Sequence, residues 1–220
     1  MTSDRRYANT PEIHIESYVF EKVESFTYLE SIVHMNNDIT QEIKHCITVV
    51  NKCYFGLLQH MKSHVLLRSI KVLICKTLIR PILTYASETW TISKTNEYDL
   101  FCFERKILNR IYGPVFENGI WRKRYNQELY TLFKNPDISK YIKISRLRWA
   151  GHLMRMKDEE IPRKIITLQM GGQRGRVRLR MRWIDGVNGD AVSLRMRNWR
   201  MIVLDWDRWR RVLEEAQIQR

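Results

Sequence analysis

The sequence has few cysteines and no long apolar stretch, and both absences narrow the class of protein. Cys46, Cys53, Cys75 and Cys102 lie far apart without a C-x-x-C pair, which argues against a zinc ribbon or a disulfide framework. The first ten residues, MTSDRRYANT, lack the apolar core of a signal peptide, and no run approaches about 20 apolar residues. We therefore expect a protein of the nucleus or cytoplasm without a membrane partner.

The sequence also lacks the motifs that carry common chemistry. It contains no Walker loop, no H-E-x-x-H, no Ser-His-Asp order and no adjacent pair of aspartates. Its acidic groups at 158–160, 205–207 and 214–215 are predicted to form a solvated turn and surface ion pairs with Arg208, Arg210 and Arg211. Metal-assisted catalysis needs carboxylates that converge on one ion. We expect no catalytic residues, no metal site, no cofactor and no small-molecule substrate.

Positive charge is what the chain has in excess. Lys and Arg number 38 against 24 Asp and Glu, a formal net charge of +14. Residues 140–220 hold 20 basic and 9 acidic residues, whereas residues 1–139 hold 18 and 15. An excess of this size indicates a polyanionic partner, most often nucleic acid. The C-terminal third is therefore the predicted binding surface.

The segment MGGQRGRVRLRMRW, residues 170–183, places an arginine at every second position. We call these five residues the arginine comb: Arg174, Arg176, Arg178, Arg180 and Arg182. In an extended chain they project to one side, about 7 Å apart, a spacing that suits successive phosphates of a single strand. Such contacts give salt-sensitive affinity without reading the bases. The alternative is a solvated basic linker with no partner.

Hydrophobic periodicity predicts a mainly α fold with a small β element at the front. Residues 12–33 read as a strand pair that turns at Glu21-Lys22. Helical spacing and breakers then predict helices over 40–61, 66–78 (ending or kinking before Pro81), 95–112, 122–133, from the Asp137 cap onward, 178–192 and 197–217. The last helical stretches are expected to break near Gly186 and Gly189.

The segment RLRWAGHLMRM, residues 146–156, lies on the helix that Asp137 caps. Projected at 100° per residue, Trp149 joins one apolar face and Gly151 the opposite one, so the helix is predicted to be sandwiched, with Gly151 allowing close approach. Arg146, Arg148 and Arg155 are expected to emerge at the borders and contact nucleic acid. His152 is interpreted as a hydrogen-bonding edge residue rather than a catalytic histidine.

Three further tryptophans follow in the last helical segment. The spacing of Trp199, Trp206 and Trp209 places them on one face of a continuous helix. That pattern favours core packing over an exposed base-stacking platform.

Six blocks, in the expected order, resemble a known family. They are FTYLESIV, YASETW, FERKILNRIYGPVFENGIWRKRYNQELY, RLRWAGHLMRM, RNWR and DRWRRVLEEA. From about Ile13 to the end, the chain resembles the C-terminal part of endonuclease–reverse transcriptases of non-LTR, LINE-like retrotransposons of the RTE type. The resemblance implies the end of a palm, a thumb and a basic C-terminal region. The Asp-Asp palm motif and the endonuclease domain of that family are absent from these 220 residues.

The chain departs from the family pattern at three positions inside these blocks. Glu30 and Ala86 stand where the family usually has glycine, and Val177 where it has proline. If the first glycine forms a tight turn, a carboxylate in its place is expected to disturb it.

The resemblance divides the expected fold into three regions. They are a β-hairpin remnant of the palm (1–37), a helical thumb-like region (38–134) and a basic helical C-terminal region (135–220) with the arginine-rich segment 171–182. We expect a truncated reverse-transcriptase fragment that binds RNA or DNA in a sequence-tolerant way. The alternatives are a helical protein-interaction module or inert remnant, and an active polymerase or nuclease.

Overall fold

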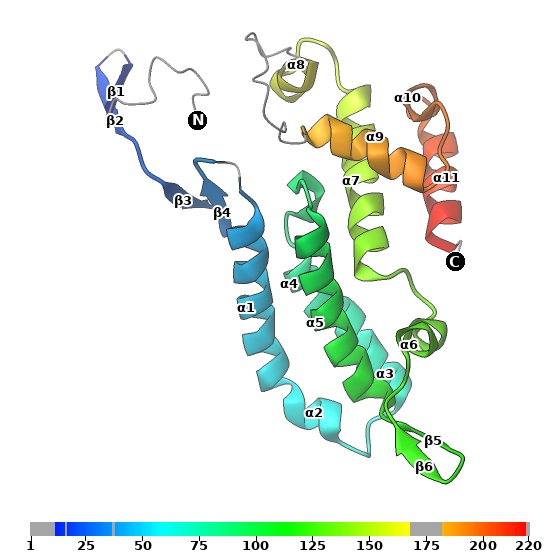
Figure 1. Cartoon of the computed structure of the whole chain (residues 1–220). Coiled ribbons are helices and arrows are strands. Elements are labelled where there is room, and N and C mark those ends of the chain that lie inside the picture. The colour runs from blue at the N-terminus through cyan, green and yellow to red at the C-terminus, as the bar shows by residue number, and fades with distance from the viewer. Residues whose placement is uncertain (1–11, 16, 37, 168–181, 219–220) are drawn as a thin grey trace.

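The computed structural model describes residues 12–15, 17–36, 38–167 and 182–218. Within these ranges the protein is mainly helical with short antiparallel strand pairs, which confirms the predicted fold class. No helix among them is long and apolar enough to cross a membrane. Figure 1 shows the strands of the N-terminal segment standing to one side of a bundle of helices.

The N-terminal segment forms two hairpins rather than the single one predicted. Strand β1 (Glu12–Ile15) pairs with β2 (Tyr18–Glu21), and β3 (Ser25–Tyr28) pairs with β4 (Ser31–His34). The expected turn at Glu21-Lys22 is instead the connection between the hairpins. The β3–β4 turn has positive φ at both Leu29 (45°) and Glu30 (66°), the backbone of a two-residue hairpin loop that favours glycine. Glu30 therefore occupies a tight turn, as its glycine counterpart in the resembling family implied.

The first helices follow the predicted spacing. Helix α1 (Thr40–Gly56) buries Ile43, Cys46, Val50 and Tyr54, one residue per turn, and α2 (Leu58–Lys62) continues after a break at Leu57. The inward face of α1 is fixed at its start by Glu42, whose Oε2 accepts a hydrogen bond of 2.5 Å from the backbone of Ile32 on β4. This bond ties the second hairpin to the helical body.

The second predicted helix runs past Pro81, before which it was expected to end or kink. Helix α3 (Arg68–Ile74) passes into a π-helical turn, η2 (Cys75–Ile79), and then into α4 (Arg80–Leu83) with Pro81 in its first turn. A prolyl ring clashes with the carbonyl four residues earlier in an α-helix and removes one donor. The wider π turn relieves that clash, so the chain keeps its direction.

Helix α5 (Lys94–Tyr112) matches its prediction within one residue. Ser93 caps it by accepting a hydrogen bond from Asn96 N, and Gly113 ends it with φ of +67°. Before it lies a short 3₁₀ turn, η3 (Ser87–Thr89), entered through Ala86 in the left-handed conformation. Strands β5 (Val115–Glu117) and β6 (Ile120–Arg122) then form a hairpin around Asn118-Gly119.

Helix α6 (Asn126–Phe133) begins four residues later than predicted, because Arg122 is still part of β6. Glu128 defines the start of α6: its Oε2 accepts a hydrogen bond of 2.7 Å from Tyr125 N. The next helix, α7 (Ile138–Arg155), begins where Asp137 accepts a bond of 2.8 Å from Lys140 N, as predicted.

The remaining described helices are shorter than the two predicted for this region, but the predicted break near Gly186 and Gly189 is wrong, because one helix runs through both. They are α8 (Ile161–Thr167), α9 (Trp183–Ser193), α10 (Trp199–Ile202) and α11 (Trp206–Ile218). The predicted helix 197–217 is interrupted at 203–205, where Asp205 Oδ1 accepts a bond from Arg208 N and starts α11 anew.

Two hydrophobic cores hold these elements together, and α7 belongs to both. The first core gathers buried residues of α1–α6 and ends with Ile138 and Ile142 of α7. The second begins two residues later, with Ile144, and gathers side chains of α7, α9, α10 and α11. At the first core Glu104 is the common acceptor: it binds Arg80 Nη2 (2.5 Å), Tyr130 Oη (2.9 Å) and Ile138 N (3.0 Å). These bonds join α4, α5, α6 and α7.

Candidate nucleic-acid interface

Helix α7 is buried on two sides, as its sequence predicted. Ile138 and Ile142 pack in the first core, and Ile144, Leu147 and Ala150 pack in the second. Figure 1 shows α7 running beside α5, with α9 crossing it and α11 alongside. The strip of α7 left between these neighbours is where side chains can reach a ligand.

At Gly151 another helix packs closely against α7, as the presence of a glycine inside this helix predicted. A Cβ atom at this position would clash with the indole Nε1 of Trp209 and come within 2.9 Å of its Cδ1 and 3.0 Å of Val203 Cγ2. Glycine therefore allows α11 to pack directly on the backbone of α7. The indole nitrogen of Trp209 is itself buried, with no hydrogen-bond partner among the described residues.

Arg146 does not emerge at the border of α7, so its predicted exposure is wrong. It is only 4% exposed, and its guanidinium is 2.6 Å from Asp190 Oδ2 on α9. It also donates to the carbonyl oxygen of Trp90, which follows η3. Desolvation raises the pKa of Asp190, and the charge of Arg146 opposes that shift. A 100° projection places Arg146 at an edge, but α9 and the η3 segment both cover that edge.

Arg148, Trp149 and His152 form an exposed surface on α7. The ring centroids of Trp149 and His152 are 5.3 Å apart, and the angle between the two ring planes is 36°. The predicted burial of Trp149 is wrong: 40% of it is exposed, because it lies beyond Ile142, where the first core ends. His152 is exposed at an edge, as predicted, but the hydrogen bond expected of it is not found within the described residues. Arg148 is exposed and has no hydrogen bond or ion pair with the part of the chain that the structure describes.

Arg155 and Trp206 extend this surface toward α11. The guanidinium carbon of Arg155 lies 4.6 Å from the centroid of the Trp206 ring, and its Nη1 donates to Val203 O at 3.0 Å. Trp206 is about half exposed. Arg155 thus remains near the surface, as expected, but it is held against an aromatic ring. We call Arg148, Trp149, His152, Arg155 and Trp206 the α7 stripe.

The three C-terminal tryptophans do not share one helix face. Trp199 on α10 and Trp209 on α11 are buried, with centroids 6.3 Å apart, whereas Trp206 is exposed. The sequence placed all three in the core because the spacing was projected on one continuous helix. The missed signal was Asp205, a helix-capping residue type immediately before Trp206.

The arginine comb falls mostly outside the described residues. Arg174, Arg176, Arg178 and Arg180 lie there. Arg182 is described: it is exposed and precedes α9, where its backbone nitrogen donates to Asp185 Oδ2 at 3.2 Å.

Several acidic residues of the described chain take part in structural contacts. Asp205 caps α11, and Arg210 pairs with Asp207 at 3.5 Å and with Glu214 at 4.0 Å, as predicted for surface pairs. No three His, Cys, Asp or Glu side chains gather to hold a metal ion in the ranges given above.

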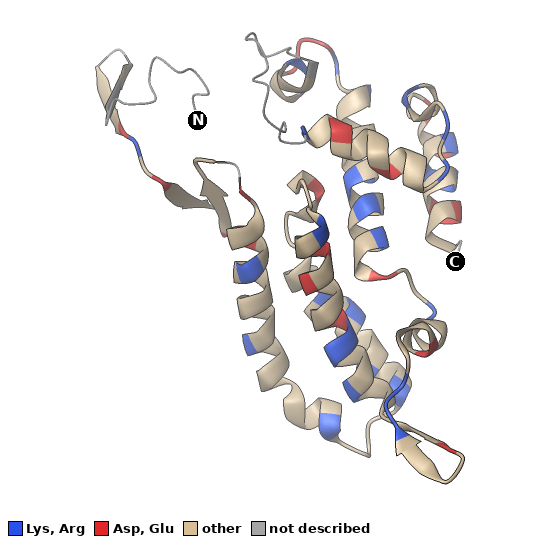
Figure 2. Cartoon of the chain, in the orientation of Figure 1, with Lys and Arg blue, Asp and Glu red and all other residues tan. Residues whose placement is uncertain are grey.

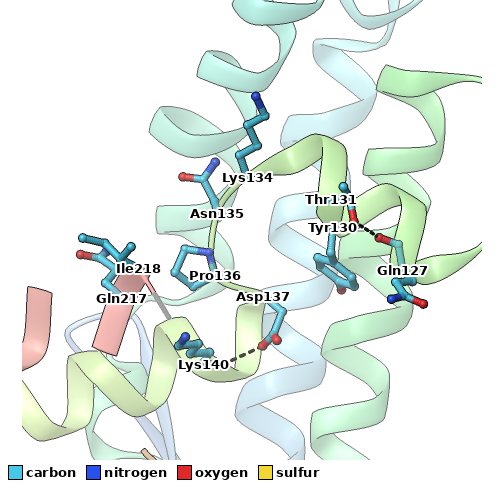
Figure 3. Close-up of a pocket in the computed structure, with 10 residues that line it drawn as sticks. All are labelled: Gln127, Tyr130, Thr131, Lys134, Asn135, Pro136, Asp137, Lys140, Gln217 and Ile218. Carbon is cyan, nitrogen blue, oxygen red and sulfur yellow. Dashed lines mark hydrogen bonds between the residues drawn. The ribbon is translucent and has the colours of Figure 1, made fainter. Parts of the chain in front are cut away.

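An open pocket of about 770 Å³ lies elsewhere, where α6, the start of α7 and the end of α11 meet (Figure 3). Its lining includes Lys134, Lys140 and Gln217 with the carboxylate of Asp137. That carboxylate is already the cap of α7, as the dashed line to Lys140 in Figure 3 shows. Nothing in the sequence predicted this pocket, and its amides and amines supply no nucleophile paired with a base.

Comparison with known proteins finds similarity to a transposon-derived protein. The chain is 22% identical over 199 residues to a putative uncharacterized transposon-derived protein of Caenorhabditis elegans, covering 88% of this chain and 71% of the relative. No protein-family model matches the chain. No solved structure matches it.

Proposed function

We propose that this chain binds a strand of RNA or DNA without strong sequence preference, and that it is the C-terminal part of a non-LTR retrotransposon reverse transcriptase. The observation that carries the binding proposal is the α7 stripe, in which the exposed Arg148, Trp149 and His152 continue along α7 to the part-buried Arg155 and its ring partner Trp206. A formal net charge of +14 supports the same partner.

The chemistry of the stripe suits a single strand. Arginine forks bind phosphate oxygens, and aromatic faces stack on bases that are not paired. Every base offers a π face, so stacking tolerates any sequence. The tilted Trp149–His152 pair offers two neighbouring rings. Arg155, already stacked on Trp206, keeps its planar fork at a fixed place beside them.

The transposon origin and the reverse-transcriptase type rest on different observations. The relative from C. elegans is named as transposon-derived. The reverse-transcriptase type rests on the six ordered blocks of resemblance in the sequence. Because the chain has no adjacent aspartates to hold polymerase metals, we propose that it has no catalytic activity of its own. Primer extension or strand cleavage by the purified chain with Mg²⁺ would contradict this part of the proposal.

The binding proposal is tested with a fluorescein-labelled 20-nucleotide strand of mixed sequence, measured by fluorescence anisotropy at several salt concentrations. We expect Trp149→Ala to weaken binding by about 1–3 kcal/mol, roughly 5- to 150-fold in Kd. The control is Trp121→Ala, which removes a tryptophan that is more exposed than Trp149 (67% against 40%) from the β5–β6 hairpin at the other end of the molecule (Figure 1). No binding by the unchanged protein at low salt would refute the proposal.

A protein-interaction role is the second candidate, and the N-terminal hairpins favour it. All residues of β2 and β3 are exposed, among them Tyr18, Phe20 and Phe26. Exposed apolar residues gathered on one element mark interaction surfaces. Light scattering distinguishes the two: self-association that Phe20→Ser and Phe26→Ser abolish, without nucleic-acid binding, would put this candidate first.

A further inference from the structure

A second basic site lies at the far end of the first core from the α7 stripe. A pocket of about 690 Å³ opens between the loop that joins α2 to α3 and the C-terminal end of α5. Lys62, His64, Arg68, Lys71 and Arg110 contribute to its lining, which contains no carboxylate. The other lining residues are Met61, Ser63, Leu66, Leu67, Ile111, Tyr112 and Gly113.

Lys71 distinguishes this pocket from an ordinary basic surface. It is only 8% exposed, and its ammonium group donates to the backbone carbonyl of Ser63 at 2.7 Å. Within the described residues no carboxylate lies at ion-pair distance from Lys71 or from the exposed Arg68 and Arg110. A buried ammonium that only a carbonyl compensates is costly, so an anion in the pocket would lower the free energy of the charged site.

The C-terminal ends of α2 and α5 at this pocket oppose an anion, but their partial charges are weaker than the full charges of the side chains. The end of α5 carries roughly half a negative charge from its unpaired carbonyls. Arg124 Nε, which donates to Gly113 O at 3.1 Å, already offsets part of that charge. Lys62, Arg68, Lys71 and Arg110 bring four full positive charges to the same opening. The balance at the pocket is therefore positive.

We propose that this pocket binds phosphate groups of a nucleic-acid strand and forms a second contact, separate from the α7 stripe. The inference rests on the proposed function, because it assigns another part of the same ligand. Arg68 and Arg110 are exposed and offer planar forks to phosphate oxygens, while Lys71 supplies a point charge at the back. Helix α5 spans the distance from near η3, which meets α7, to this pocket. Its 19 residues make α5 about 28 Å long, so the pocket lies at the far end of this helix from the contact between η3 and α7.

The test compares two double variants by anisotropy with the same 20-nucleotide strand. Arg68→Ser/Arg110→Ser removes two charges from the pocket, and the control Lys44→Ser/Lys52→Ser removes two exposed charges from α1. Each lost phosphate contact reduces the slope of log K against log salt by about 1. We expect the pocket variant to lose about 2 from that slope and the control to keep it. Equal slopes in both variants would overturn the inference while leaving the α7 stripe intact.

A second measurement does not depend on strand binding. Inorganic tripolyphosphate is titrated into the ¹⁵N-labelled protein, and backbone amide shifts are followed by NMR. We expect saturable shifts at residues 62–71 and 110–113, and a several-fold weaker response in Lys71→Gln, whose folding is checked by its thermal melt. Shifts confined to other regions overturn the proposal, even if the protein binds no strand. Pocket-dependent binding to phosphatidylserine vesicles, with strand affinity unchanged in the pocket variant, would assign the site to lipid and also overturn it.

Discussion

The indole ring of Trp209 lies directly on the backbone of Gly151, so closely that α7 has no room for a methyl group there. We expect Gly151→Ala to destabilise the protein by about 1–3 kcal/mol, because a buried tryptophan and Val203 must both shift. Urea unfolding followed by far-UV circular dichroism measures the change.

The matched control for this variant is Gly189→Ala. Gly189 is an exposed glycine in α9, and a Cβ atom there meets nothing within 4 Å. Alanine at an exposed helical position is more stable than glycine by about 1 kcal/mol. The two substitutions should therefore shift stability in opposite directions. A loss of stability in both would show that the close contact with Trp209 is not the cause.

The buried pair of Arg146 and Asp190 predicts strong non-additivity. Breaking it with Arg146→Met or Asp190→Leu leaves one charge buried without its partner, which costs about 3–5 kcal/mol. In the double variant Arg146→Met/Asp190→Leu neither charge remains, so we expect less destabilisation than in either single variant. Urea midpoints of the four proteins test this. Additive losses would mean that the pair does not act as a unit.

Two residues occupy left-handed backbone where the resembling family has glycine. Glu30 has φ of 66° and Ala86 has φ of 53°. Side chains with a Cβ atom are disfavoured there, so we expect Glu30→Gly and Ala86→Gly each to stabilise the protein by about 1 kcal/mol. Thermal melts measure both. Lys44→Gly in α1 is the control, and it should destabilise by a similar amount because its backbone is helical.

Acid should loosen the β5–β6 hairpin before it unfolds the helices. Hydrogen bonds from Arg122 and from Tyr125 N lower the pKa of Glu128 from its ordinary 4.5 to about 2. Since this pKa is depressed in the folded state, the contact stabilises fully above about pH 4.5 and is lost as the pH falls toward 2. Trp121 fluorescence should follow this loss. In Glu128→Gln the hairpin signal should change little over the same range of pH.

The sequence predicted the positions of helices well and the exposure of individual side chains less well. Helix α5 and the cap of α7 were predictable because Ser93, Asp137 and Gly113 are local signals. Gly151 was predictable because only a close contact calls for glycine inside such a helix. The burial of Arg146 and the exposure of Trp149 were not predictable, because they depend on how far α9 and the first core extend over α7. The pocket around Lys71 brings together three segments that no local pattern connects.

Figure 2 shows Lys and Arg along both α7 and the helices of the first core, on elements that α7 joins rigidly. Because one unbroken helix leaves the first core after Ile142 and enters the second at Ile144, the number of residues between them sets the rotation of one core relative to the other. Inserting one residue at 143 would turn one core by about 100° against the other and move it about 1.5 Å along the axis. A strand held at both the α7 stripe and the Lys71 pocket would no longer find the two sites in register.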